Sequence, residues 1–79
     1  MPKAVIVFST PECANCKPLK AALAAAGVAI QEVNCHETSS FDLMRRYGVR
    51  GVPTTIVTDG VEVRTVIGNK PQDVLSLLQ

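Results

Sequence analysis

Short apolar runs alternate with amphipathic segments along this chain, and their spacing predicts an order of strands and helices. The run over residues 3–8 shows no alternation and is rich in β-branched side chains, which is typical of a central strand covered on both faces. A helical pattern follows, with Leu19 and Leu23 on one face. It stops at Gly27, a residue that suits the position just after a helix.

The start of this first helix has two alternatives, because Pro18 lies close to it. A helix that begins at Ala14 would lose one backbone donor and bend at the proline, whereas one that begins near Cys16 would hold the proline in its first turn at little cost. Residues 28–34 then predict a second strand. One charged and two amide side chains within it favour a place at the edge of a sheet.

A second helix and a third strand are expected in the middle of the chain. Ser39 or Ser40 would cap a helix that ends at Gly48. A loop follows over residues 49–53. The β-branched run over residues 54–58 then predicts the third strand.

The last part of the chain predicts a hairpin and a final helix. Asp59-Gly60 is a strong two-residue hairpin signal and leads into a fourth strand over residues 61–67, and the last helix follows Pro71. The order is therefore β-α-β-α-β-β-α. Right-handed crossovers would make the first three strands parallel, and the hairpin would make the fourth antiparallel. The expected fold is α/β, with a four-stranded mixed sheet, helices on both faces and a single domain over residues 1–79.

Composition and charge narrow the classes of function. The chain has 79 residues and a net charge of +1, so neither a nucleic acid nor a membrane is expected as a partner. The apolar run near the start is shorter than the roughly 7–15 residues of a signal-peptide core. Nothing approaches the ~20 apolar residues of a membrane span. A cytoplasmic protein is expected, and in that compartment a Cys-x-x-Cys pair is more often catalytic than structural.

Cys13 and Cys16 form such a pair where the first strand passes into the first helix. The first helical positions carry unpartnered N–H groups and partial positive charge, which would stabilise a thiolate at Cys13, and the thiolate is the form that attacks disulfides. Two ordinary buried cysteines are one alternative. A metal site shared with Cys35 and His36 is another, but adjacent residues are poorly spaced for one metal. The end of the second strand is also expected to lie away from this helix start. We therefore expect Cys35 to serve as a small apolar residue and His36 as a polar loop residue.

The element order, the cysteine pair and a Val-Pro before the third strand resemble the thioredoxin fold. The motifs are residues 8–17, Gly51-Val52-Pro53-Thr54, and Asp59-Gly60 leading to Gly68. The chain is most similar to small glutaredoxin-like proteins with thioredoxin-like activity, including those that reduce ribonucleotide reductase. The resemblance implies that Cys13 is the nucleophile and Cys16 the resolving thiol. It also implies that Pro53 is a cis-proline and that the substrate-binding surface comprises Pro11, Val52, Pro53, Thr54 and Gly68.

The function expected from this resemblance is that of a thiol–disulfide oxidoreductase that reduces protein disulfides. A monomer with no bound cofactor is expected, with a thioredoxin-reductase type flavoenzyme as electron donor. Glutathione binding stays open, because Thr10 stands where many glutaredoxins have a lysine and Gly68-Asn69 replaces their Gly-Gly. Two alternatives remain: a glutathione-dependent glutaredoxin that acts on mixed disulfides, and a metal or iron–sulfur carrier that binds through Cys13.

Overall fold

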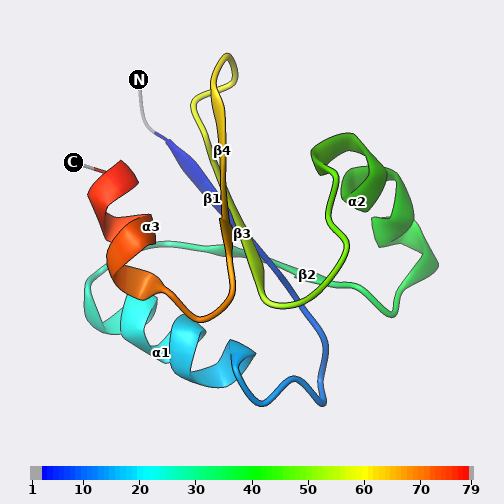
Figure 1. Ribbon diagram of the computed structural model, residues 1–79, viewed down its shortest axis with the longest axis horizontal. Coiled ribbons are helices and arrows are strands. Elements are labelled where there is room, and N and C mark those ends of the chain that lie inside the picture. Colours follow the sequence, from blue (N-terminus) through cyan, green and yellow to red (C-terminus); the bar gives the residue numbers. More distant parts are fainter. Residues whose placement is uncertain (1–2, 79) are drawn as a thin grey trace.

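The chain folds into one four-stranded sheet with helices on both faces (Figure 1). The computed structural model describes residues 3–78. Its elements are β1 (Ala4–Ser9), α1 (Cys16–Ala25), β2 (Gln31–Asn34), a 3₁₀ turn (Thr38–Ser40), α2 (Phe41–Tyr47), β3 (Thr54–Thr58), β4 (Val63–Ile67) and α3 (Pro71–Leu77). The strands lie in the order β2-β1-β3-β4. The predicted order of elements and the mixed sheet are therefore confirmed.

β1 is the central strand and builds a core on each face of the sheet. Val5 and Val7 lie in one cluster with α1 and α3, while Ile6 and Phe8 lie in another with α2. The period of two along a strand explains this division. In Figure 1, α1 and α3 accordingly lie together on one side of the sheet and α2 lies on the other. The prediction that both faces of this strand are covered is confirmed.

The predicted direction of the third strand is wrong. β2 runs parallel to β1, but β3 runs antiparallel to it, with Thr54 opposite Phe8 and Thr58 opposite Ala4. α2 has only seven residues, about 10 Å of helix, so it does not carry the chain back along the sheet. Gly48, at φ 67°, turns the chain, and the loop over residues 49–53 returns it to the edge from which it left. The third strand therefore starts beside the end of β1, where the cysteine loop begins.

Two strands are shorter than expected. β2 begins at Gln31, and the apolar residues before it pack against the core from an irregular segment. β4 begins at Val63 instead of residue 61.

The prediction of a two-residue hairpin is wrong, because residues 59–62 all lie between β3 and β4. The Asp59 carboxylate accepts the amide protons of both Val61 and Glu62, each at 2.9 Å, and these bonds hold the wider loop. Of the residues of β4, only Val66 is buried. The edge position expected for β2 is confirmed.

The helix ends settle the alternatives left open by the sequence. α1 begins at Cys16, so Pro18 falls in the first turn, where amide protons have no helical acceptor. Gly27, at φ 79°, follows its end as expected. Ser40 lies at the start of α2, but its hydroxyl donates to the Glu37 carbonyl at 2.6 Å and does not cap the helix.

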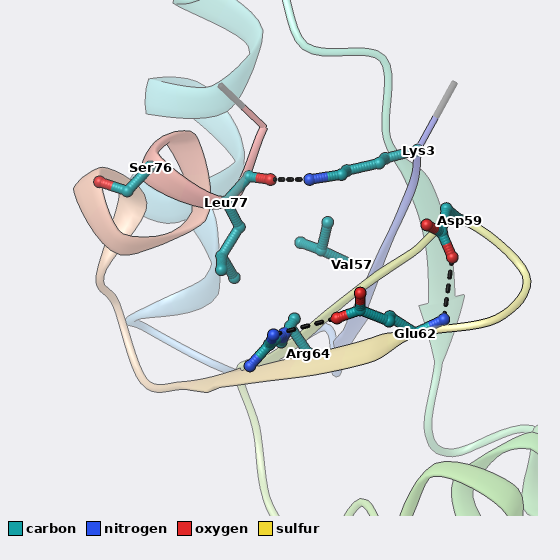
Figure 2. A pocket seen from close by; sticks show the side chains of 7 residues that line it. All are labelled: Lys3, Val57, Asp59, Glu62, Arg64, Ser76 and Leu77. Atoms are coloured by element: carbon teal, nitrogen blue, oxygen red, sulfur yellow. Dashed lines mark hydrogen bonds and ion pairs between the residues drawn. The ribbon is translucent and has the colours of Figure 1, made fainter. Parts of the chain in front are cut away.

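The two ends of the described chain meet at the edge of the sheet farthest from the cysteines. Figure 2 shows the Lys3 ammonium donating to the Leu77 carbonyl, at 2.6 Å, in the last turn of α3. A cation at a helix C-terminus is favourable, because the last carbonyls carry partial negative charge. Within residues 3–78, no helix has the length and apolar character needed to cross a membrane.

Candidate active site

The cysteine pair lies in the loop between β1 and α1, at the carboxyl edge of the central strand. β1 ends at Ser9, and a turn follows in which the Cys13 amide donates to the Thr10 carbonyl at 3.2 Å. Cys16 is the first residue of α1. Cys13 and Cys16 are joined by a disulfide, with their Cα atoms 5.4 Å apart, in the usual range for such a bond.

The two sulfur atoms differ sharply in access to solvent. Cys16 is 1% exposed and lies on the inner face of α1 with Leu19 and Leu23, whereas Cys13 is partly exposed in the loop. Cys13 also precedes the helix, where the unpaired amides of the first turn stabilise a negative charge. In the reduced protein, Cys13 is therefore the more accessible thiol and the one whose thiolate the start of the helix stabilises.

The Val52–Pro53 segment reaches the same edge of the sheet. Its peptide bond is cis, as the resemblance implied. Thr54 pairs with Phe8 of β1, and the Gly68 amide donates to the Pro53 carbonyl at 2.9 Å. The antiparallel β3 therefore places Pro53 and Gly68 beside the end of the strand that leads to Cys13.

The remaining residues of the expected binding surface lie in different environments. Pro11 is exposed in the cysteine loop, and Val52 is 36% exposed. Thr54 is buried, and its hydroxyl donates to the Gly51 carbonyl at 2.7 Å. Pro11 and Val52 are thus available to a partner through their side chains. The Thr54 side chain instead holds the turn that presents Val52.

The end of β2 lies beside the cysteine loop, contrary to expectation. The Cys35 amide donates to the Ser9 carbonyl at 2.9 Å, and the His36 ring contacts the Glu12 carboxylate next to Cys13. The reason is that parallel β1 and β2 both end at this edge of the sheet. The hydrogen bond from His36 lowers the pKa of Glu12. No local pattern along the chain joins His36 and Glu12, because their contact depends on where two loops meet.

Cys35 lies on the α2 side of the sheet rather than with the cysteine pair. It packs against the core of Ile6, Phe8 and Ile56, and burial raises the pKa of its thiol. Within residues 3–78, no group of three or more His, Cys, Asp or Glu side chains is arranged to hold a metal ion. The structure therefore brings His36 to the cysteine loop but assembles no metal site there.

The two sides of the cysteine loop differ in polarity. Toward β2, a pocket of about 250 Å³ is lined by Thr10, Pro11 and Lys17, among others. Lys20 and Glu32 form an ion pair within it. The other side carries the partly exposed Val52. The exposed apolar side chain of Val52 therefore lies on the side away from this polar pocket.

A second polar pocket lies at the opposite edge of the sheet. Figure 2 shows it lined by charged side chains from the ends of β1, β3 and β4, and its volume is about 350 Å³. Its ionic groups already have partners in the protein. Lys3 donates to the Leu77 carbonyl, Arg64 pairs with Glu62 at 3.0 Å, and Asp59 accepts two backbone amides. The Lys3 contact joins the start of β1 to α3, and the other contacts hold the loop between β3 and β4.

The Glutaredoxin family model matches residues 5–63. No curated protein sequence matches the chain as a relative. The family match spans β1 from Val5 onward, both cysteines, the cis-proline and β3.

Several solved structures with the same fold are thioredoxins. The long form of spinach chloroplast thioredoxin f has a TM-score of 0.83 and 23% identity over 98% of this chain and 68% of its own. The germline-specific thioredoxin Deadhead of Drosophila melanogaster has a TM-score of 0.80 and 16% identity over 96% and 77%. Oxidised mitochondrial thioredoxin 3 of Saccharomyces cerevisiae has a TM-score of 0.77 and 22% identity over 96% and 76%.

Structural matches at these sequence identities show the fold alone. The match to the family model also covers the cysteine motif. The matched residues contain a cysteine pair that closes a disulfide at the start of α1, next to a cis-proline. Such a pair exchanges two electrons with other thiols. The chain belongs to the glutaredoxin family and is a thiol–disulfide oxidoreductase.

Proposed function

We propose that the protein reduces disulfides in other proteins through a Cys13–Cys16 dithiol. The Cys13 thiolate attacks one sulfur of the substrate disulfide, and the second substrate sulfur leaves as a thiolate and takes a proton. The Cys16 thiolate then attacks the Cys13 sulfur of the mixed disulfide, and the first substrate sulfur leaves. Two electrons pass to the substrate, and the Cys13–Cys16 disulfide remains to be reduced.

The observation that carries this proposal is the contrast between the two cysteines beside an exposed backbone segment. Cys13 is partly exposed and Cys16 is 1% exposed. Val52 is 36% exposed, and none of the backbone hydrogen bonds found within residues 3–78 uses its amide or carbonyl. An extended substrate segment can pair with such a backbone as an added strand. Its disulfide would then lie over Cys13, next to the apolar side chains of Val52 and Pro11.

The proposed electron donor is a flavoenzyme of the thioredoxin-reductase type. Each charge-assisted hydrogen bond to glutathione would contribute about 1.5–3 kcal/mol, and the family's usual partners are replaced at Thr10 and Asn69. A protein donor would use the Val52 surface instead. One neighbour of the same fold, a thioredoxin f2 with 21% identity, was solved in complex with ferredoxin:thioredoxin reductase. Ribonucleotide reductase is a candidate substrate by resemblance.

The test supplies one protein disulfide substrate with two electron sources under matched conditions. One is NADPH with thioredoxin reductase, and the other is NADPH with glutathione and glutathione reductase. We expect the higher kcat/KM with thioredoxin reductase. Efficient turnover with glutathione and none with thioredoxin reductase would instead identify a glutathione-dependent enzyme. Visible absorbance of the anaerobically purified protein, without turnover by either source, would favour the iron–sulfur carrier.

A matched pair of variants tests the two-cysteine cycle. Cys16→Ser should trap a stable mixed disulfide with the substrate, because the internal attack is lost. Cys13→Ser should trap none, since the remaining thiol is buried. If Cys16→Ser keeps most of its activity toward glutathione mixed disulfides, then a one-thiol mechanism replaces the two-thiol cycle.

A further inference from the structure

A buried hydroxyl in β3 has no hydrogen-bond partner in the disulfide form. Thr55 is 0% exposed, and within residues 3–78 its Oγ1 is the one buried side-chain polar atom that lacks a partner. An unpartnered buried hydroxyl destabilises the fold. Valine has nearly the same shape and suits a buried strand better. We therefore expect this hydroxyl to have a hydrogen-bond partner in a second state of the protein.

The strand register places this hydroxyl between the sheet and α1. Thr55 pairs with Val7 of β1 and with Val66 of β4. Both valines, like Val57 two residues further along β3, belong to the core cluster that contains Leu19 and Leu23 of α1. Because residues two apart on a strand share a face, Thr55 lies on the α1 side. Its row is also closer to the cysteine edge of the sheet than the row of Val57.

Among the buried side chains of α1 and α3, Cys16 is the candidate acceptor. The buried residues of α1 are Cys16, Leu19 and Leu23, and Val74 is the buried residue of α3. Of these four side chains, only that of Cys16 can accept a hydrogen bond. Cys16 is also the first residue of α1 and so lies at the cysteine edge. In the disulfide form its sulfur is bonded to that of Cys13 and makes no hydrogen bond with Thr55, and reduction breaks the bond that holds the sulfur toward Cys13.

We propose that Thr55 is a positioning residue, whose hydroxyl donates a hydrogen bond to the Cys16 sulfur when the disulfide is reduced. The hydroxyl is then satisfied in the dithiol form and unpartnered in the disulfide form. It raises the population of the Cys16 thiolate that attacks the mixed disulfide at Cys13, and it keeps its own proton. The inference rests on the cycling of the Cys13–Cys16 couple and holds for any donor or substrate.

The primary test measures the redox equilibrium of the purified protein against a dithiothreitol couple. Thr55→Val removes the unpartnered group from the oxidised form and the hydrogen bond from the reduced form. We expect the oxidised form to be favoured about tenfold, which makes the reduction potential more negative by about 30 mV. Thr55→Ala removes the same hydroxyl and carries the same expected direction, so the test does not depend on one variant.

Two controls separate this role from a purely structural one. Thr55→Ser keeps the hydroxyl and should stay within about a factor of two of the wild-type equilibrium. Thr58→Val makes the same substitution at the far end of β3, where the hydroxyl donates to the Glu62 carbonyl at 2.7 Å, and it should leave the equilibrium unchanged. A wild-type equilibrium in both Thr55→Val and Thr55→Ala would overturn the proposal, since a buried water would then satisfy Thr55 in both forms.

Thermal unfolding of the oxidised and reduced proteins gives an independent readout. Thr55→Val should raise the Tm of the oxidised form relative to that of the reduced form. Equal changes in both forms would contradict the proposal, because packing alone would then explain them. Neither measurement uses a reductase or a protein substrate. A failure here is therefore distinguishable from a failure of the proposed function.

Discussion

Selective alkylation of Cys13 in the reduced protein is the most direct consequence of the site's geometry. Cys16 is 1% exposed on the inner face of α1, whereas Cys13 is partly exposed in the preceding loop. A reagent must open the first turn of α1 to reach Cys16. Opening transfers about one apolar group into water, roughly 0.8 kcal/mol, and breaks about one backbone hydrogen bond, roughly 1 kcal/mol.

Together these costs amount to about 2 kcal/mol, so the reactive form of Cys16 is populated roughly 30-fold less than the closed form. The helix N-terminus acts in the same direction, since it favours the Cys13 thiolate that reacts with the reagent. We therefore expect Cys13 to be alkylated at least about 30 times faster than Cys16 at neutral pH.

The assay is a brief anaerobic exposure of the reduced protein to iodoacetamide. Fragmentation of the labelled peptides in a mass spectrometer then gives a rate for each cysteine. Cys16→Ser and Cys13→Ser serve as single-thiol controls, so that labelling of one thiol does not alter the other. Equal rates for the two cysteines, or faster labelling of Cys16, would refute the assignment of Cys13 as nucleophile.

Three further predictions concern residues outside the pair. Lys3→Met should lower Tm by about 2–4 °C at low salt, because it removes a cation worth roughly 0.5 kcal/mol from the Leu77 carbonyl; an unchanged Tm would show that the contact is not stabilising. His36→Ala should raise the pKa of Glu12 toward the ordinary glutamate value in an NMR titration. The stability from this contact is present above the pKa of an unfolded glutamate and is lost as pH falls through the lowered pKa of Glu12, so variant and wild type should converge in acid. Cys35→Ala should keep reductase turnover within about a factor of two, or ~0.4 kcal/mol in activation free energy. A large loss of turnover with unchanged Tm would reveal a third redox cysteine. In the wild type, the raised pKa of the Cys35 thiol should make its alkylation slower than that of Cys13.

Much of the fold follows from local patterns in the sequence. The β-branched run over residues 54–58 predicts the bounds of β3 as observed, and the uninterrupted run before Ser9 predicts a strand covered on both faces. The cysteine pair follows from spacing, because Cys13 and Cys16 stand where a strand passes into a helix. These predictions succeed because each depends on neighbours a few residues away.

The predictions that failed concern features that depend on contacts between distant parts of the chain or on the lengths of helices and loops. The turn at Asp59-Gly60 is widened by bonds to backbone amides further along, which composition does not reveal. The contact between His36 and Glu12 arises because β1 and β2 end at one edge. Both features are tertiary, and the residue types alone are compatible with ordinary solvent-exposed loops.

The direction of β3 has the largest consequence for function. A parallel third strand would begin at the edge of the sheet opposite to the cysteines, and Pro53 would then lie far from Cys13. The expected parallel strand and the expected binding surface were therefore incompatible, and a helix of seven residues decides between them. Because β3 is antiparallel, its first residues meet the end of β1. The strand thus follows closely after the exposed Val52 and places the Thr55 hydroxyl in the layer beneath α1. One reversal of chain direction in this way supplies both the surface proposed to meet a partner and the buried group proposed to act on the resolving thiol.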